Sequence, residues 1–187
     1  MFTAFRNNLA RSVKRSRACE NLARCDSGAT AVEFALVAAP FFAMLVALFQ
    51  TALVFFASRV LDETTEQASR YIMTGQAQQS NMTQAGFQTW VCGQTFALFN
   101  CNSFMINVQA YSSFSSASTG APTLTYDAHG NVTNSFGYNT GNPGDIVVVQ
   151  VLYQWPVVLG PLGFNLANLS NGDRLLMSTA VFKNEPY

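Results

Sequence analysis

A long apolar run near the N-terminus is the feature that most constrains this chain of 187 residues. No residue from Phe34 to Ser58 is ionisable, and Glu33 is the only charged residue between Asp26 and Arg59. About 20 apolar residues cross the hydrocarbon core of a bilayer, and a backbone in lipid must satisfy its own polar groups. The run therefore predicts a transmembrane helix over residues 29–58. Pro40, inside it, either kinks the helix or marks a packing face.

The charges on either side of the run indicate its orientation. Residues 1–28 hold six basic and two acidic side chains, whereas residues 29–187 hold four basic and eight acidic ones. The positive-inside rule predicts a basic cytoplasmic leader at 1–28 and export of residues 59–187 to the opposite side of the membrane. The run is longer than the apolar region of a cleaved secretory signal, which favours a single-pass anchor. Topology explains the basic residues, so the lipid bilayer is the expected partner and nucleic acid is not.

The helical pattern continues beyond the span. Leu61, Thr64, Ala68 and Ile72 recur at helical spacing, which predicts one helix over about residues 30–74 with a stalk at 59–75. Gly75 is the expected C-terminal stop. Glu66 and Arg70 have the spacing of a favourable i, i+4 ion pair.

The exported part is predicted to hold a second, shorter helix from Asn81, its candidate N-cap, to about Phe99. Cys92 and Cys101 should form a disulfide in an oxidising compartment, with two buried thiols as the alternative. Residues nine apart on one helix are separated by about 13 Å, whereas a disulfide needs Cα atoms roughly 4.4–6.8 Å apart. A disulfide therefore requires a break in the helix, at Gly93 or Asn100. In the leader, Cys19 and Cys25 should be free thiols in the reducing cytoplasm.

Three segments are predicted to be strands. Residues 104–114 alternate, residues 146–153 are continuously apolar like a central strand covered on both faces, and residues 174–182 form the last strand. A polar segment at 112–145, rich in Ser, Thr, Gly and Asn, is expected to be a loop with a short strand near 123–126. The predicted fold class is α+β: a helical anchor and stalk, then a short helix and a roughly three-stranded antiparallel sheet within residues 81–187.

The sequence contains few residues in a pattern that would indicate catalysis. Its single histidine, His129, lies in a polar loop and is expected to be solvated, and no acidic cluster suggests a metal. We therefore expect neither an enzyme nor a cofactor or metal site. Glu33 has two interpretations. Its side chain reaches the cytoplasmic surface, or, if the chain is cut between Gly28 and Ala29, it pairs with the new α-amino group one helical turn away.

The N-terminal motif and the C-terminus resemble those of one family. Residues 28–37, Gly-Ala-Thr-Ala-Val-Glu-Phe-Ala-Leu-Val, with Pro40 behind them, and the ending at 180–187 are similar to those of TadE-like proteins. These are pseudopilins of the bacterial tight-adherence (Flp) pilus system, which serves attachment and biofilm formation.

The resemblance implies that prepilin peptidase cuts after Gly28, so that the mature chain begins at Ala29. Glu33 and Phe34 would then serve subunit pairing in a minor pilin-like subunit of this type IV pilus. Its partners would be other pilins and pseudopilins and the inner-membrane assembly platform. The alternative is an uncleaved, membrane-anchored periplasmic adhesion or binding protein that uses the loop at 112–145.

Overall fold

The structure, a computed structural model, describes residues 26–95, 98–128, 130–158 and 163–187, with the backbone alone at 26–29. The predictions for residues 1–25, including Cys19 and Cys25, and for His129 lie outside the described residues. Residues up to 45 and residues 46–187 form two separate compact units.

The first helix, α1 (Asp26–Met73), runs without interruption and contains Pro40. It begins about four residues earlier than expected and ends close to the predicted stop. Gly75 has a positive φ of 77°, and its N–H donates to the carbonyl of Ile72 at 2.9 Å. A left-handed glycine is a frequent way to end a helix, because it carries no Cβ to clash.

Two helices follow where one was predicted. The four-residue α2 (Gln76–Gln79) was not expected, and α3 (Gln84–Gln94) is shorter than the predicted helix. The N-cap prediction was wrong: Thr83 caps α3, with its Oγ1 accepting from the N–H of Gly86 at 3.2 Å. Asn81 instead has a positive φ of 47° and belongs to the turn between the two helices. Asparagine tolerates this conformation better than most residues.

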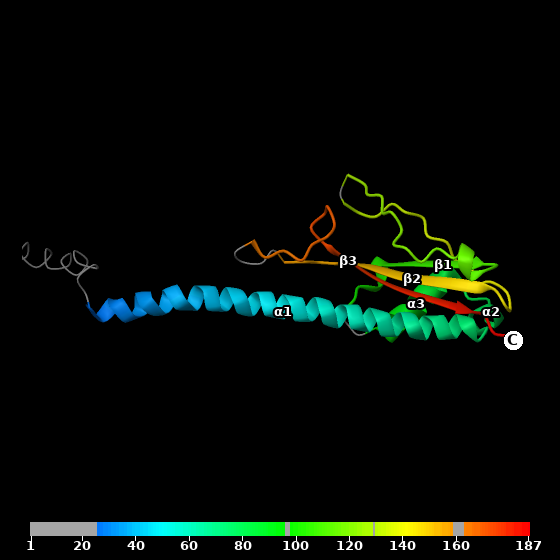
Figure 1. Ribbon diagram of the computed structural model, residues 1–187, viewed down its shortest axis with the longest axis horizontal. Helices are drawn as coiled ribbons and strands as arrows, with labels where there is room; N and C mark the ends of the chain where they lie inside the picture. The colour runs from blue at the N-terminus through cyan, green and yellow to red at the C-terminus, as the bar shows by residue number, and fades with distance from the viewer. Residues whose placement is uncertain (1–25, 96–97, 129, 159–162) are drawn as a thin grey trace, which may run out of the picture. The chain divides into compact units, whose positions relative to one another are not determined.

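Three antiparallel strands form one sheet in the order β1-β2-β3, as Figure 1 shows. Their bounds are β1 (Phe104–Tyr111), β2 (Ile146–Trp155) and β3 (Arg174–Lys183). The α+β class is confirmed. The first strand ends three residues earlier than predicted, and the short strand expected near 123–126 is reduced to an isolated bridge between Tyr126 and Val132.

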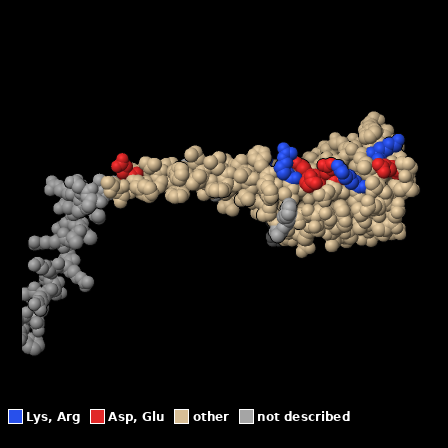
Figure 2. All heavy atoms as spheres, turned by 90° about the horizontal axis from the view of Figure 1, so that it is seen from below, with Lys and Arg blue, Asp and Glu red and all other residues tan. Residues whose placement is uncertain are grey.

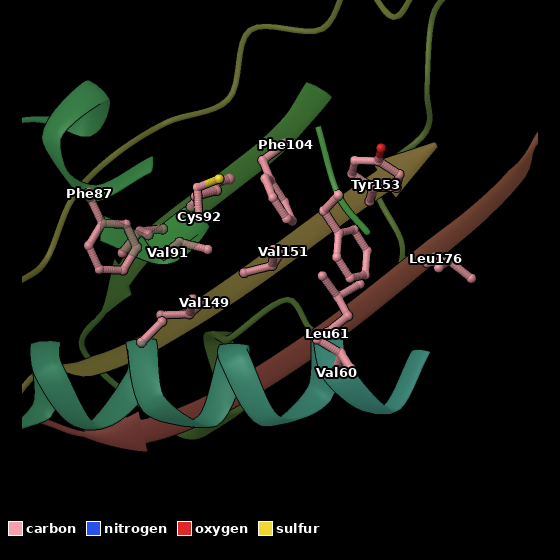
Figure 3. Close-up of a cluster of buried hydrophobic side chains, with 14 of the residues drawn as sticks. Val60, Leu61, Phe87, Val91, Cys92, Phe104, Val149, Val151, Tyr153 and Leu176 are labelled. Carbon is pink, nitrogen blue, oxygen red and sulfur yellow. The ribbon is translucent and has the colours of Figure 1, made fainter. Parts of the chain in front are cut away.

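The main core lies between one face of the sheet and the helices α1 and α3. Figure 3 shows Val149 and Val151 of β2 on the same side as Leu61 of α1 and Phe87 of α3. All four side chains are buried. The period-2 alternation of β2 places its odd-numbered residues in this core.

The opposite face of β2 is also buried, which confirms the prediction of a central strand covered on both faces. Val148, Gln150 and Leu152 are at most 3% exposed. The Gln150 amide donates to the carbonyl of Gly120 at 2.9 Å and accepts from the side chain of Asn107 at 3.0 Å. The loop at 112–145 therefore covers this face, and Figure 1 shows it on the side of the sheet away from α1.

Candidate functional site

The predicted processing and pairing residues all lie on α1. Gly28 and Ala29 fall in the first turn of the helix, which starts at Asp26. Glu33 follows Ala29 by four residues, so the two positions lie on one face of the helix, one turn apart. The helix thus presents the backbone geometry that pairing between Glu33 and an amine at position 29 requires.

The side chain of Glu33 is exposed. Its apolar neighbours are exposed as well: Val32 by 61%, Phe34 by 72% and Leu36 by 72%. Among the described residues, none forms an ion pair or hydrogen bond with the Glu33 carboxylate. With respect to the described residues, the carboxylate is therefore a charge without a partner at one end of an apolar surface.

That apolar surface extends along the helix. The sixteen residues between Glu33 and Gln50 are all apolar, and the segment from Thr30 is long and apolar enough to cross a membrane by length and composition. A helix that is apolar on every side needs lipid or other helices around it. Its large exposed side chains are Val32, Phe34, Leu36, Val37, Phe41, Phe42, Met44, Val46, Leu48 and Phe49.

Charge reappears on α1 after this surface. Arg59 lies 3.7 Å from Asp62, and Arg70 lies 2.8 Å from Glu66, the i, i+4 pair that the sequence predicted. Figure 2 shows charged side chains gathered along one visible face of residues 46–187. The four side chains of the two ion pairs are at least half exposed, so each pair contributes only about 0–1 kcal/mol to stability.

The predicted disulfide joins Cys92 of α3 to Cys101, with a Cα–Cα distance of 5.4 Å. As required, no helix spans the two residues. Of the two expected positions for the break, Gly93 is still helical, since α3 ends at Gln94, whereas Asn100 has an extended backbone. Cys101 begins the short 3-10 helix η2 (Cys101–Ser103), in which the Asn100 side chain accepts from the N–H of Asn102 at 3.1 Å.

The C-terminal segment ties α1 to the loop at 112–145, a role that the sequence did not reveal. Asn184 is 2% exposed, and its Nδ2 donates to the carbonyls of Thr140 at 2.8 Å and Asn142 at 3.1 Å. The next residue, Glu185, donates its N–H to the carbonyl of Met73 at the end of α1. The Asn184 amide thus holds the end of the chain against the loop, and the Glu185 N–H holds it against the end of α1.

The alternative site, on the loop at 112–145, holds one open hollow of about 280 Å³. Gln84, Gln88, Asn134, Ser135 and Phe136 line part of it. The described residues contain no cluster of three or more His, Cys, Asp or Glu side chains that could hold a metal ion.

Comparison with known proteins supports the motif at the N-terminus. Residues 28–70 match the family model for TadE-like proteins, and this match includes Gly28, Ala29, Glu33 and Phe34 but not the ending at 180–187. No curated protein and no solved structure matches the chain. The family match supports an association with the tight-adherence pilus system. Over residues 28–70, called the TadE-like segment below, the chain is similar to TadE-like proteins.

Proposed function

We propose that this chain is a minor pilin-like subunit, a pseudopilin, in the assembly of a tight-adherence pilus. One observation carries the proposal: the TadE-like segment contains Gly28 and an exposed Glu33 directly before the apolar stretch of α1 at residues 34–49. A structural role in assembly, without catalysis, fits this arrangement. The leader would stay in the cytoplasm, and residues 59–187 would lie in the periplasm, where oxidising conditions favour the Cys92–Cys101 disulfide.

Cleavage after Gly28 by prepilin peptidase would give Glu33 its partner. The cut removes the six basic residues of the leader and leaves a positive α-amino group on Ala29. In an apolar environment an unpaired carboxylate is costly, and a nearby opposite charge offsets part of that cost. Glu33 would pair with the Ala29 amine of its own chain or of a neighbouring subunit, and Phe34 would pack beside the pair.

Exposed apolar side chains on α1 provide the rest of the assembly surface. Neighbouring pilin or pseudopilin helices would cover them, because packing between helices in lipid depends on close contact rather than on escape from water. The inner-membrane assembly platform would receive the subunit from the bilayer. This organisation makes the N-terminal helix the pairing element and leaves the sheet domain free for other contacts.

The N-terminus of the protein tests this proposal directly. The chain should be purified from membranes of a strain that has its native secretion systems, and its first residues should be sequenced. We expect a start at Ala29, and Gly28→Leu should retain the leader because a bulky residue replaces the small one before the cut. A native start at Met1 would contradict the proposal and favour the uncleaved adhesion or binding protein.

Glu33 is tested by piliation in vivo. We expect Glu33→Ala and Glu33→Gln to insert into the membrane normally but to fail in assembly, because both remove the charge. Glu63→Ala, which removes an acid from a later turn of the same helix, is the matched control and should leave assembly intact. Normal piliation by Glu33→Gln would rule out charge pairing.

A further inference from the structure

The connection between β2 and β3 packs against α1 within the predicted membrane span. The side-chain amide of Gln50 donates to the carbonyl of Val158 at 2.8 Å, across 108 positions of sequence. Leu53 and Val54 of α1 and Trp155 of β2 border the same hollow, of about 130 Å³. Its remaining lining residues are Pro156, Val157 and Leu166. Residues 50–54 belong to the segment, 29–58, that the sequence assigns to the bilayer.

The length of the hydrocarbon core places this contact at the outer boundary of the bilayer. Twenty helical residues rise about 30 Å, which is the thickness of that core. If the core begins at Thr30, the twentieth residue is Phe49; if it begins just after Glu33, the twentieth residue is Leu53. With either starting point, the hydrocarbon ends next to the helix residues that contact the connection.

The chemistry of this region suits a membrane surface. The sequence contains no ionisable residue from Pro156 to Gly172. Val158 is 73% exposed. On the helix, Leu53, Phe55 and Phe56 are each exposed by half or more. Large apolar side chains exposed together on a folded domain indicate a binding surface.

Trp155 adds a second indication. Its ring packs against Phe99 with centroids 5.7 Å apart, yet the residue is only partly buried and borders the hollow beside Gln50. Tryptophan is enriched where membrane proteins cross the headgroup region, because one part of the ring is apolar and the N–H is polar. Trp155 therefore contacts the core on one side.

We propose that Pro156, Val157 and Val158, together with the exposed side chains of Leu53, Phe55 and Phe56 on α1, form a second membrane contact that rests on the outer boundary of the bilayer. This inference depends on the membrane insertion of α1 that the proposed function includes. Lipid is the favoured occupant, because the surface continues the charge-free apolar surface of α1 and charged residues return only at Arg59. The contact lies at the headgroup level, where water can satisfy non-helical backbone groups that hydrocarbon could not.

Spin labels on the full chain in phospholipid vesicles test this contact. In a background of Cys19→Ser and Cys25→Ser, which keeps the Cys92–Cys101 disulfide, single labels are attached through Val158→Cys, Leu36→Cys or Val181→Cys. Oxygen concentrates in the bilayer and a nickel chelate stays in water, so the ratio of their collision rates reports depth. Val181 is the matched control, since it is an exposed valine, 36% accessible, on β3.

We expect the label at position 158 to favour oxygen over the nickel chelate, as the label at position 36 should, while the label at 181 favours the chelate. Equal ratios at 158 and 181, with the label at 36 in lipid, would overturn the second contact but leave the membrane helix intact. A label at position 36 that collides freely with the nickel chelate would overturn both the second contact and the membrane insertion of α1. Dipolar broadening between labels at 158, with protection from both agents, would show a second copy of the chain there instead and would also overturn the proposal.

Discussion

Asn184→Asp replaces one amide nitrogen with oxygen and barely changes the size of the side chain, so it isolates the hydrogen bonds that hold the C-terminal segment. The native Nδ2 donates to the carbonyl oxygens of Thr140 and Asn142 at 2.8 and 3.1 Å, and the residue is 2% exposed. In the variant, a carboxylate oxygen would face the same two carbonyl oxygens. Two attractive contacts would become repulsive ones at a buried site.

The expected destabilisation follows from those contacts. Each buried group left without a partner costs about 1–3 kcal/mol, and an unpaired buried carboxylate adds to that until it takes up a proton. We therefore expect Asn184→Asp to lower the free energy of unfolding by roughly 3–5 kcal/mol at pH 7. Asn184→Ala should lower it by only about 1–2 kcal/mol, because the Thr140 carbonyl keeps the Gln78 amide as a donor at 2.9 Å.

The pH dependence separates this mechanism from a simple packing defect. Burial next to carbonyl oxygens should raise the pKa of the new carboxyl group in the folded state above its unfolded value. A group with a raised folded pKa is least harmful when protonated, so the deficit should shrink as the pH falls from 7 through that folded pKa. The protonated carboxyl group also regains one donor. Asn184→Ala should show no such recovery.

Urea unfolding of the full chain in detergent micelles, followed by tryptophan fluorescence, measures these differences. Asn102→Asp is the matched control, because Asn102 is exposed and makes no side-chain hydrogen bond in the structure. That variant should change the free energy of unfolding by no more than about 0.5 kcal/mol. The reasoning fails if Asn184→Asp is no less stable than Asn184→Ala at pH 7, or if its deficit does not depend on pH.

Two further predictions concern the sheet domain. The double variant Cys92→Ala/Cys101→Ser should lose about 2–3 kcal/mol of stability in the same urea assay, since its unfolded chain regains the entropy of a closed loop of about ten residues. A urea midpoint equal to that of the parent would contradict this. Burial, and to a lesser degree the nearby Tyr71, raises the pKa of Tyr138 to about 12, so the folded protein should lose stability as the pH rises from about 10, the unfolded pKa, toward 12. The Tyr138 hydroxyl is buried without a partner, so thermal unfolding between pH 8 and 12 should find Tyr138→Phe at least as stable as the parent at pH 8 and less sensitive to alkali.

The parts of the fold that the sequence predicted are those with strong local patterns. The uncharged run from Phe34 to Ser58 allows little besides a long helix, and the continuous apolar run at 146–153 allows little besides a covered central strand. The disulfide was expected from the oxidising compartment, and the need for a helix break followed from the distance between its two cysteines. The candidate site at Gly28 and Glu33 was visible because its residues are close together in the sequence.

The features that were not predicted from the sequence depend on which of two similar residues caps a helix, or on contacts between residues far apart in the sequence. Asn81 and Thr83 are both common N-cap residues, and the path of the chain after α2 decides that Thr83 caps α3. The four residues of α2 are too few to show a helical period. Asn184 meets its partners across more than 40 residues, so no local pattern could reveal the contact. For the contact between Gln50 and Val158, the sequence offers one signal: Gln50 is a single amide side chain within an apolar run.

The two parts of α1 differ in the exposure of their side chains, so substitutions in each part should have different effects. Between residues 57 and 72 the helix buries one face of small and medium side chains, including Ala57, Leu61 and Ala68. Thr64 on this buried face donates its hydroxyl to the carbonyl of Val60 at 2.8 Å, so this hydroxyl has a hydrogen-bond partner although it is buried. The described residues before 50 expose large apolar side chains, and none of them is among the buried residues of that core. A substitution at Glu33 should therefore leave the unfolding of the sheet domain unchanged, and an assembly defect in that variant would report on pairing between helices rather than on misfolding.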